Sequence, residues 1–460
     1  MNADIFADRN ALDHTRSISQ VCKIWRDLML NSPLLWGRLL DLDALCLGRQ
    51  EWRCEVLRRT GQAPLSIRSE EATRRSISLT PQRILPPSEN KEQKVPSTME
   101  FFFSLLDNEW HRIERLSVRI GPYVTIPPEI LSSTAPQLKV FEVYSISELD
   151  VPADLTLFDD RAPLLRVFRS RDLIFKPSAS WLQNLQILEI GAQFRIPFVL
   201  DILKNTPKLE KLIYSGPYDE VIPEGTPAAP VFTLNPNLQH LTIGASVEAC
   251  LYLISSIVPY HDYGLNISGS RLIPRVSFHG LSVYTERHFQ VHIPTEVTLD
   301  LWNTFHFTSR NADTSYFTVM ISCSRRSRDQ LRILSALQLP TLTLVTTLHL
   351  AVPDYLQEEA TSQVVEFLRL LPNLKVLDIK DSVCPYLMSI QQQTSDILLS
   401  SLDTLQVDIL SEHVLDFLRL RRELGCPVAV LDLRKSAEPG VLRISLENLQ
   451  RLTGLQVLWD

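Results

Sequence analysis

The stretch LPNLKVLDI, residues 371–379, joins a proline to a short segment that has the alternation of a strand. Its pattern, Pro-x-Leu-x-x-[Leu/Phe], recurs in APQLKVFEV (135–143), APLLRVFRS (162–170), TPKLEKLIY (206–214) and NPNLQHLTI (235–243). Three segments fit without the proline: LQNLQILEI (182–190), LSSLDTLQV (399–407) and LTGLQVLWD (452–460). The 29 prolines of the chain would give roughly one proline-led copy by chance, so five copies indicate an internal repeat.

The spacing of the copies identifies the kind of repeat. Their first leucines, at positions 138, 165, 185, 209 and 238, are 27, 20, 24 and 29 residues apart. Positions 374, 402, 428 (a valine, in PVAVLDL) and 455 follow at steps of 28, 26 and 27. These steps are typical of leucine-rich repeats, although the usual asparagine position is missing. We therefore predict an irregular array of such repeats.

Most copies follow a helical stretch, such as TSQVVEFLRLLPN (361–373) or VLDFLRLRRELG (414–425). One helix and one strand cannot bury their apolar faces alone, so successive repeats should stack into a solenoid. The fold class is α/β, with a curved, mostly parallel sheet and helices on its convex side. We expect five strands to lie side by side in this sheet: Leu138–Val143, Leu185–Ile190, Leu209–Tyr214, Leu238–Ile243 and Leu374–Ile379.

Two regions depart from the repeat. Residues 262–335 contain IPRVSF, LSVYT, HFQVHI, EVTLDLW and SYFTVMIS, which alternate like strands, and we predict a strand-rich continuation of the same sheet there. Residues 76–98 hold four prolines and no aromatic residue, which is typical of a disordered insertion. A second loop of this kind is EVIPEGTPAAP (220–230).

Near the N-terminus, SQVCKIWRDLMLNSPLLWGRL (19–39) predicts a tight pair of helices. Apolar residues at steps of three and four form one stripe, made of Ile18, Val21, Cys22, Trp25, Leu28 and Met29. The helix should end near Leu30, because Pro33 disfavours helical geometry at the residue before it. Ser32 is a suitable N-cap for a second short helix, and Pro33 is a suitable first residue. From the residues alone, the two tryptophans face either the core of the chain or a partner.

The order Val-Cys, Trp three residues later, and Ser-Pro-x-Leu-Trp closely resembles the second half of an F-box. The segment that follows, residues 39–67, is similar to the corresponding part of fungal F-box proteins, where a helix ending in an Arg-rich turn and Gly leads to a Pro-Leu strand. The resemblance implies a substrate-recruiting subunit of a Skp–cullin–F-box ubiquitin ligase that works in the cytoplasm or nucleus. Its partners would be the Skp adaptor, cullin through the adaptor, and a protein substrate. By resemblance, the adaptor-binding residues are Ile18, Val21, Cys22, Trp25, Pro33, Leu34 and Trp36.

The resemblance is incomplete, since residues 1–17 lack the Leu-Pro opening of an F-box and keep only Asp4-Ile5-Phe6 as a remnant. The alternative hypothesis is therefore a stand-alone leucine-rich-repeat scaffold whose vestigial F-box no longer binds the adaptor. With the first F-box helix missing, part of the hairpin should stay open to solvent. We predict a half-exposed apolar patch formed by Ile18, Val21, Cys22, Trp25 and Trp36. The expected division is a partial F-box in 1–50, a connecting helix and strand in 51–75, the insertion 76–98, and the array in 99–460.

The sequence offers no set of residues that predicts an enzyme or a cofactor site. It has neither a glycine-rich phosphate loop nor a zinc spacing of Cys and His. In the predicted strand, His288 and His292 would lie about 13 Å apart, too far to share a metal ion, whereas on a helix they could chelate one. Asp41 and Asp43 are expected to cap a helix. A third interpretation, a hydrolase or transferase, requires a catalytic cluster assembled from distant residues.

Composition indicates a folded protein, with 45% hydrophobic and 22% charged residues and a net charge of −7. The charges are interspersed, which does not favour nucleic acid or a membrane as partner, and the basic run 324–332 is predicted to begin a solvated helix. The seven cysteines are scattered and odd in number, which predicts reduced core thiols. The tryptophans outside the hairpin, Trp52, Trp110, Trp181, Trp302 and Trp459, are expected in the core.

Overall fold

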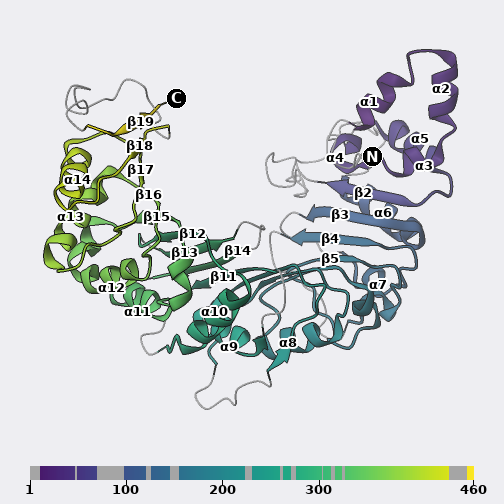
Figure 1. Cartoon of the computed structure of the whole chain (residues 1–460). Helices are drawn as coiled ribbons and strands as arrows, with labels where there is room; N and C mark the ends of the chain where they lie inside the picture. Colours follow the sequence, from purple (N-terminus) through teal and green to yellow (C-terminus); the bar gives the residue numbers. More distant parts are fainter. Residues whose placement is uncertain are drawn as a thin grey trace, which may run out of the picture. The chain divides into compact units, whose positions relative to one another are not determined.

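The computed structural model is a mixed α/β chain built on mostly parallel sheet (Figure 1). It describes residues 11–46, 49–69, 98–120, 126–145, 155–222, 231–258, 263–270, 276–302, 304–311, 316–323, 327–434 and 453–459. The chain divides into two compact units, residues 1–216 and 217–460. The predicted insertion 76–98 lies outside the described residues up to Thr98, where a helix begins. No described helix combines the length and apolar content that a membrane span requires.

Most helices of the first unit lie near its start. The α-helices described in this unit are α1 (Ala11–Ile18), α2 (Lys23–Leu30), α3 (Pro33–Gly37), α4 (Leu42–Cys46), α5 (Gln50–Thr60), α6 (Thr98–Glu109), α7 (Pro128–Leu131) and α8 (Ile196–Asn205). The end of α2 at Leu30 and the start of α3 at Pro33, with Ser32 as N-cap, are as predicted. The expectation of one stripe on one helix from Ile18 onward is wrong. A turn separates Ile18, the last residue of α1, from α2, whose N-cap is Cys22.

The sheet of the first unit has seven strands, and every neighbouring pair is parallel. In sheet order, which is also chain order, they are β1 (Leu40–Asp41), β2 (Leu65–Ser69), β3 (Ile113–Ile120), β4 (Val140–Ser145), β5 (Val167–Arg169), β6 (Ile187–Ile190) and β7 (Lys211–Ser215). Three of the predicted strands therefore appear here, as β4, β6 and β7.

The repeated prolines have a common structural reason. In each of the five proline-led copies, the leucine amide donates to the carbonyl three residues earlier, at 3.0–3.3 Å. Leu374, for example, donates to Leu371 O across Pro372 and Asn373 at 3.2 Å. Proline therefore occupies the second position of a four-residue turn, where its fixed φ is favourable. This leucine is buried in all five copies, and in each of them the strand begins two residues after it.

Aromatic side chains fill the core of the first unit. Phe168 stacks on Phe141 with ring centroids 5.4 Å apart and on Trp181 at 5.2 Å. Trp110 stacks on Phe158 at 6.4 Å. Trp110 and Trp181 are buried, as predicted for core residues.

The second unit holds a ten-stranded sheet in the order β9-β11-β14-β13-β12-β15-β16-β17-β18-β19. All neighbouring pairs are parallel except those that β13 makes with β14 and β12. The strands are β9 (His240–Ser246), β11 (Gly264–Ser270), β12 (Glu296–Asp300), β13 (Thr304–Arg310), β14 (Tyr316–Ser322), β15 (Thr347–Ala351), β16 (Val376–Ile379), β17 (Thr404–Val407), β18 (Val430–Asp432) and β19 (Gln456–Leu458). The two other predicted strands are β9 and β16. A separate two-stranded sheet pairs β8 (Phe232–Thr233) with β10 (Ile257–Val258).

The helices of this unit are α9 (Val247–Ser255), α10 (His279–Val291), α11 (Ser327–Ala336), α12 (Gln357–Arg369), α13 (Cys384–Gln393) and α14 (Glu412–Glu423). The prediction that LSVYT and HFQVHI are strands is wrong, because both lie mostly in α10. This helix buries Leu281, Tyr284, Thr285, His288 and Phe289, at steps of three and four. A helical period fits these residues as well as a strand period, and burial against the sheet selected the helix.

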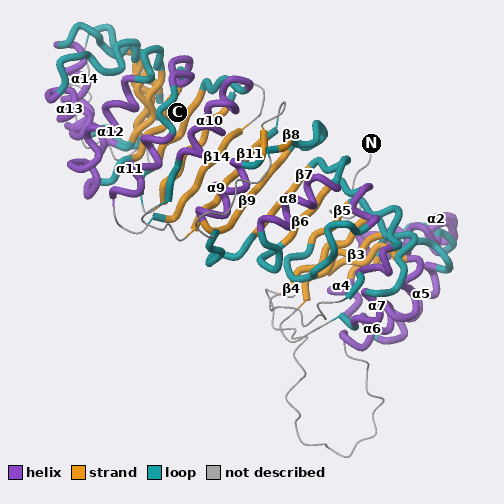
Figure 2. The backbone as a smooth tube through the Cα atoms, turned by 90° about the horizontal axis from the view of Figure 1, so that it is seen from below, coloured by secondary structure: helices purple, strands orange, loops and turns teal. Residues whose placement is uncertain are grey.

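Helices α1–α3 lie beyond the edge of the sheet at β1 and β2, whereas the later helices of each unit lie on one face of its sheet, and the opposite face carries no described helix there (Figures 1 and 2). The strands alternate accordingly. Leu348, Leu377, Leu405 and Leu431 are in register on the covered face and are buried. The residues that follow them, such as His349 and Asp378, point to the open face and are mostly half-buried. A parallel sheet is usually covered on both faces, so this open face is unusual.

Candidate protein-interaction site

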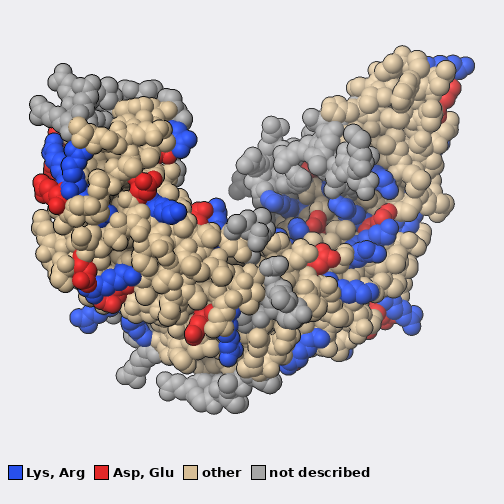
Figure 3. All heavy atoms as spheres, viewed as in Figure 1, with Lys and Arg blue, Asp and Glu red and all other residues tan. Residues whose placement is uncertain are grey.

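Helices α1–α3 expose more large apolar side chains than any comparable stretch of the described chain. Helix α2 buries none of its residues. We define the N-terminal apolar surface by its exposed members: Ile18, Val21, Ile24, Trp25, Leu28 and Leu34. On the face that Figure 3 shows, the region of α1–α3 is mostly tan, with charged side chains at its tip, whereas blue and red side chains are interspersed elsewhere. A contiguous apolar surface of this kind usually marks an interaction site.

Polar contacts fix the shape of the hairpin without covering its apolar residues. Arg26 Nε donates to Ser19 O at 3.3 Å across the turn before α2. At the other end, Asn31 Nδ2 donates to Asp27 O at 2.9 Å, and Ser32 Oγ donates to Leu28 O at 2.6 Å. These three hydrogen bonds lie within the hairpin. The apolar side chains remain exposed and available to another molecule.

The prediction of a half-exposed patch is right for four of its five residues and wrong for Trp36. Ile18, Val21, Cys22 and Trp25 are exposed, and Trp25 retains 52% of its accessible surface. Pro33 and Leu34, which the family resemblance added, are exposed as well. The sequence prediction of the patch missed Ile24 and Leu28. Leu28 lay in the predicted stripe, whereas Ile24 was not included in it, although Ile24 and Leu28 are one helical turn apart on α2.

Trp36 belongs to the core of the chain. Its accessible surface is 0%, and its indole Nε1 donates to Met29 O at 2.7 Å. Its ring meets Trp52 edge-on, with centroids 6.3 Å apart, and the guanidinium of Arg59 lies 4.7 Å from the ring centroid. Helix α5, which supplies both partners, therefore covers Trp36 and anchors α3.

The open face of the first unit carries a row of paired charges. Asp41, Arg68, Ser117, Glu142, Arg169 and Glu189 occupy successive strands in register. Arg68 pairs with Asp41 at 2.8 Å and Arg169 pairs with Glu142 at 3.2 Å. Such a row favours this pairing of the strands, and Asp41, Arg68 and Glu189 within it are buried.

Asp41 caps a helix, as expected, whereas Asp43 contacts a neighbouring strand. Asp41 Oδ1 accepts from the amides of Asp43 and Ala44, at 3.0 and 3.1 Å, at the start of α4. Burial raises the pKa of Asp41 despite its pairing with Arg68. Asp43 accepts from Ser69 Oγ at 2.7 Å. Both carboxylates therefore connect α4 to the neighbouring strand.

The open face of the second unit is polar too. The imidazole of His349 bridges two carboxylates, with Nδ1 2.6 Å from Asp378 Oδ2 and Nε2 3.2 Å from Glu296 Oε1. Further along the row, Gln406 Nε2 donates to Asp432 Oδ2 at 2.9 Å. At the end of β12, Trp302 is 45% exposed, with the Lys380 ammonium 5.4 Å from its ring centroid. Trp302 and Trp459, which is equally exposed, are thus corrections to the prediction that both lie in the core.

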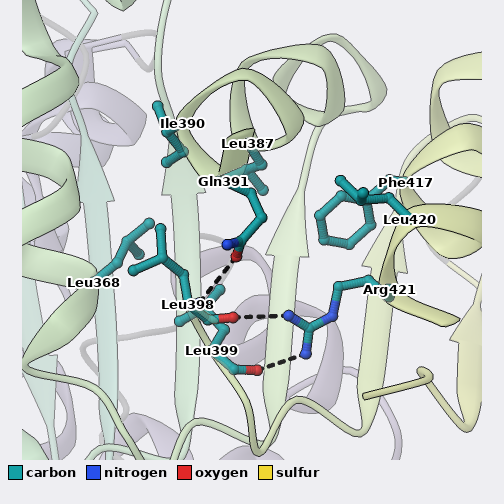
Figure 4. A pocket seen from close by; sticks show the side chains of 9 residues that line it. All are labelled: Leu368, Leu387, Ile390, Gln391, Leu398, Leu399, Phe417, Leu420 and Arg421. Carbon is teal, nitrogen blue, oxygen red and sulfur yellow. Dashed lines mark hydrogen bonds between the residues drawn. The ribbon is translucent and has the colours of Figure 1, made fainter. Parts of the chain in front are cut away.

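A pocket between α12, α13 and α14 is lined mainly by leucines (Figure 4). Arg421 closes it, donating from Nη1 to Leu398 O and from Nη2 to Leu399 O, both at 2.7 Å. These bonds hold Leu399 at a φ of 53°, in the left-handed region. The remaining cavity, about 20 Å³, has room for about one water molecule. The pocket is therefore a feature of helix packing and too small for an organic ligand.

The cysteines are only partly as predicted. Cys250 and Cys384 are buried, and burial raises the pKa of each thiol to about 12. Cys22 and Cys54 are exposed, contrary to the expectation of core thiols. Both lie in the N-terminal helical region, where fewer layers of structure cover the surface.

His288 and His292 lie on and directly after α10, with ring centroids 4.5 Å apart. The predicted separation of about 13 Å is wrong, because it assumed a strand. Within the described residues, no group of three or more His, Cys, Asp or Glu side chains is arranged to hold a metal ion. No known family model matches the chain, and no curated protein is significantly similar to it.

Proposed function

We propose that this protein is the substrate-recruiting subunit of a Skp–cullin–F-box ubiquitin ligase. In this proposal α2 and α3 bind the Skp adaptor, and the repeat array binds a target protein in the cytoplasm or nucleus. The array would be an irregular leucine-rich-repeat solenoid, with one helix or short turn and one strand in most repeats. The F-box-like order of residues 19–39 and the five proline-led copies support this proposal.

The observation that carries the proposal is the exposure of the N-terminal apolar surface. Val21, Ile24 and Leu28 together with Trp25 and Leu34 are each more than half exposed. Full burial of one such side chain stabilises a complex by roughly 1.5–3 kcal/mol before the entropy of association is subtracted. These five side chains, which include a tryptophan, could therefore supply a large part of the binding energy of a protein interface.

The open sheet faces support the second half of the proposal. Paired polar side chains in register form a surface that is rigid and already hydrogen-bonded, with exposed aromatic residues such as Trp302 at its margin. Surfaces of this composition suit a protein target, since polar groups give specificity and aromatic groups contribute binding energy. In this proposal ubiquitin transfer is carried out by the partner enzymes.

The alternative, a stand-alone interaction scaffold with a vestigial F-box, also has a specific observation in its favour. Trp36 is enclosed by Trp52 and Arg59 of the same chain. One of the two tryptophans that carry the resemblance is thus used to hold α3 on α5. In the scaffold hypothesis the N-terminal helices mainly cap the array, and Trp25 contacts a partner other than the Skp adaptor.

Co-purification of the chain with the Skp adaptor distinguishes the two hypotheses. We expect a stoichiometric complex, and we expect Trp25→Ala and Leu34→Ala each to weaken it at least about tenfold, as for interface hot spots. Trp302→Ala, which removes a tryptophan of similar exposure from the second unit, is the matched control and should bind normally. The chain extended by any residues encoded upstream of Met1 forms a second arm. If neither form binds the adaptor, the scaffold hypothesis replaces the proposal.

A further inference from the structure

Two histidines meet at the C-terminal end of α10. His288 lies in the last turn of the helix, and His292 is its C-cap, whose amide donates to His288 O at 2.8 Å. Their side chains are almost fully buried, with 1% and 4% of their surface accessible. Their ring centroids are 4.5 Å apart, with an angle of 40° between the ring planes. The four-residue spacing on a helix thus brings the two imidazoles to one place.

Several polar atoms around this pair are buried without a hydrogen-bond partner. They are Nδ1 of His288 and the hydroxyls of Tyr263 and Tyr284. The tyrosine rings lie 6.1 and 6.3 Å from the His288 ring. A buried polar atom that makes no hydrogen bond destabilises a fold by about 1–3 kcal/mol. His288 Nδ1 and these two hydroxyls therefore lack hydrogen-bond partners that a small bound ligand could supply.

We propose that His288 and His292 bind a first-row transition-metal ion, with Zn²⁺ as the best match. Imidazole nitrogen is a preferred ligand of Zn²⁺. With Zn–N bonds of about 2.0–2.1 Å and a tetrahedral angle, the centroids of two ligating imidazoles lie about 5 Å apart. The observed separation of 4.5 Å is close to this value.

The pair supplies two ligands. No third His, Cys, Asp or Glu joins it among the residues that the structure describes, so in this proposal water fills the other coordination positions. Val291 and Ile293, on either side of His292, are exposed, so the end of α10 lies at the surface.

The test uses the full chain without a histidine tag, freed of metal by a chelator and titrated with Zn²⁺ in a calorimeter. We expect one ion per chain. His288→Gln and His292→Gln should each weaken binding at least about tenfold, equivalent to about 1.4 kcal/mol. His279→Gln, at the exposed opposite end of α10, is the matched control and should bind like the natural chain. Equal binding by all three variants, or no stoichiometric binding by the natural chain, overturns the proposal.

A second measurement remains decisive if the substituted chains fold poorly. In the natural chain with isotope-labelled histidines, one equivalent of Zn²⁺ should shift the ring signals of two of the ten histidines. Signals that shift only for exposed histidines, such as His279, identify surface binding and overturn the proposal.

Discussion

Replacing Trp36 with Ala should destabilise the N-terminal helices by about 3–5 kcal/mol, the usual range for a large aromatic side chain removed from a core. The side chain is fully buried, and its removal leaves a cavity between α3 and α5. The variant also loses the bond from Nε1 to Met29 O, which contributes about 1 kcal/mol. The Arg59 guanidinium over the ring contributes a further 0.5–1 kcal/mol, approximately. Both contributions are included in the total.

Trp25→Ala is the natural comparison, because it removes the same side chain from an exposed position in the same hairpin. Substitutions on the surface usually change the free energy of unfolding by about 0.5 kcal/mol or less. Trp25 still has about half of its surface covered, so we expect a loss below about 1 kcal/mol. The free energies of unfolding of the N-terminal helices in the two variants should therefore differ by more than about 2 kcal/mol.

Native-state hydrogen exchange is the suitable assay, since the chain has two units and a single global transition is not expected. In Trp36→Ala, the protection factors of the amides of α3 and α5 should fall at least about a hundredfold. In Trp25→Ala the same amides should stay within about a factor of five of the natural chain. Equal loss of protection in both variants, or none in either, would refute the assignment of Trp36 to the core and of Trp25 to the surface.

Three further predictions concern the second unit. Arg434 lowers the pKa of Asp432 to about 2, so the pair stabilises the fold above about pH 4 and this contribution is lost as the pH falls through 2. Asp432→Asn should remove about 1 kcal/mol at pH 7 and flatten the acid limb of a stability–pH curve; an unchanged limb would contradict the pairing. Pro372→Ala should lower the free energy of unfolding in urea by about 0.4–1 kcal/mol, by loosening the unfolded chain, whereas an unchanged midpoint would argue against the turn role of proline. Gly425→Ala should destabilise by about 1 kcal/mol in the same assay, because the residue after α14 has a φ of 76°, and no loss would contradict that backbone conformation.

The positions of the strands could be predicted from the sequence because their determinants are local. In LPNLKVLDI, proline sets the turn, and alternation sets the face that Leu377 and Ile379 present to the core. Neither feature depends on the partner strand. The same holds for the break between α2 and α3, where Pro33 ends one helix and begins the next.

The region 276–323 was harder to predict, because short apolar segments fit more than one period. Residues 281–289 alternate well enough for a strand, yet they form the buried face of α10. Burial against Phe317 of β14 and against α9 gave the helix its advantage, and the contact with β14 joins segments distant in sequence. The antiparallel strands β12–β14 have no proline-led turn, so the repeat pattern gave no signal for them.

The sequence by itself determined where the repeats lie, which residues begin their strands, and that residues 19–39 form a helical hairpin rich in apolar residues. Tertiary structure alone decided which of those apolar residues are available. Trp25 and Trp36 have the same chemistry and similar neighbours, but α5 covers only Trp36. His288 and His292 likewise came together only because α10 is a helix. The physical reason is that turn and strand signals act over a few residues, whereas burial depends on contacts between segments far apart in the chain.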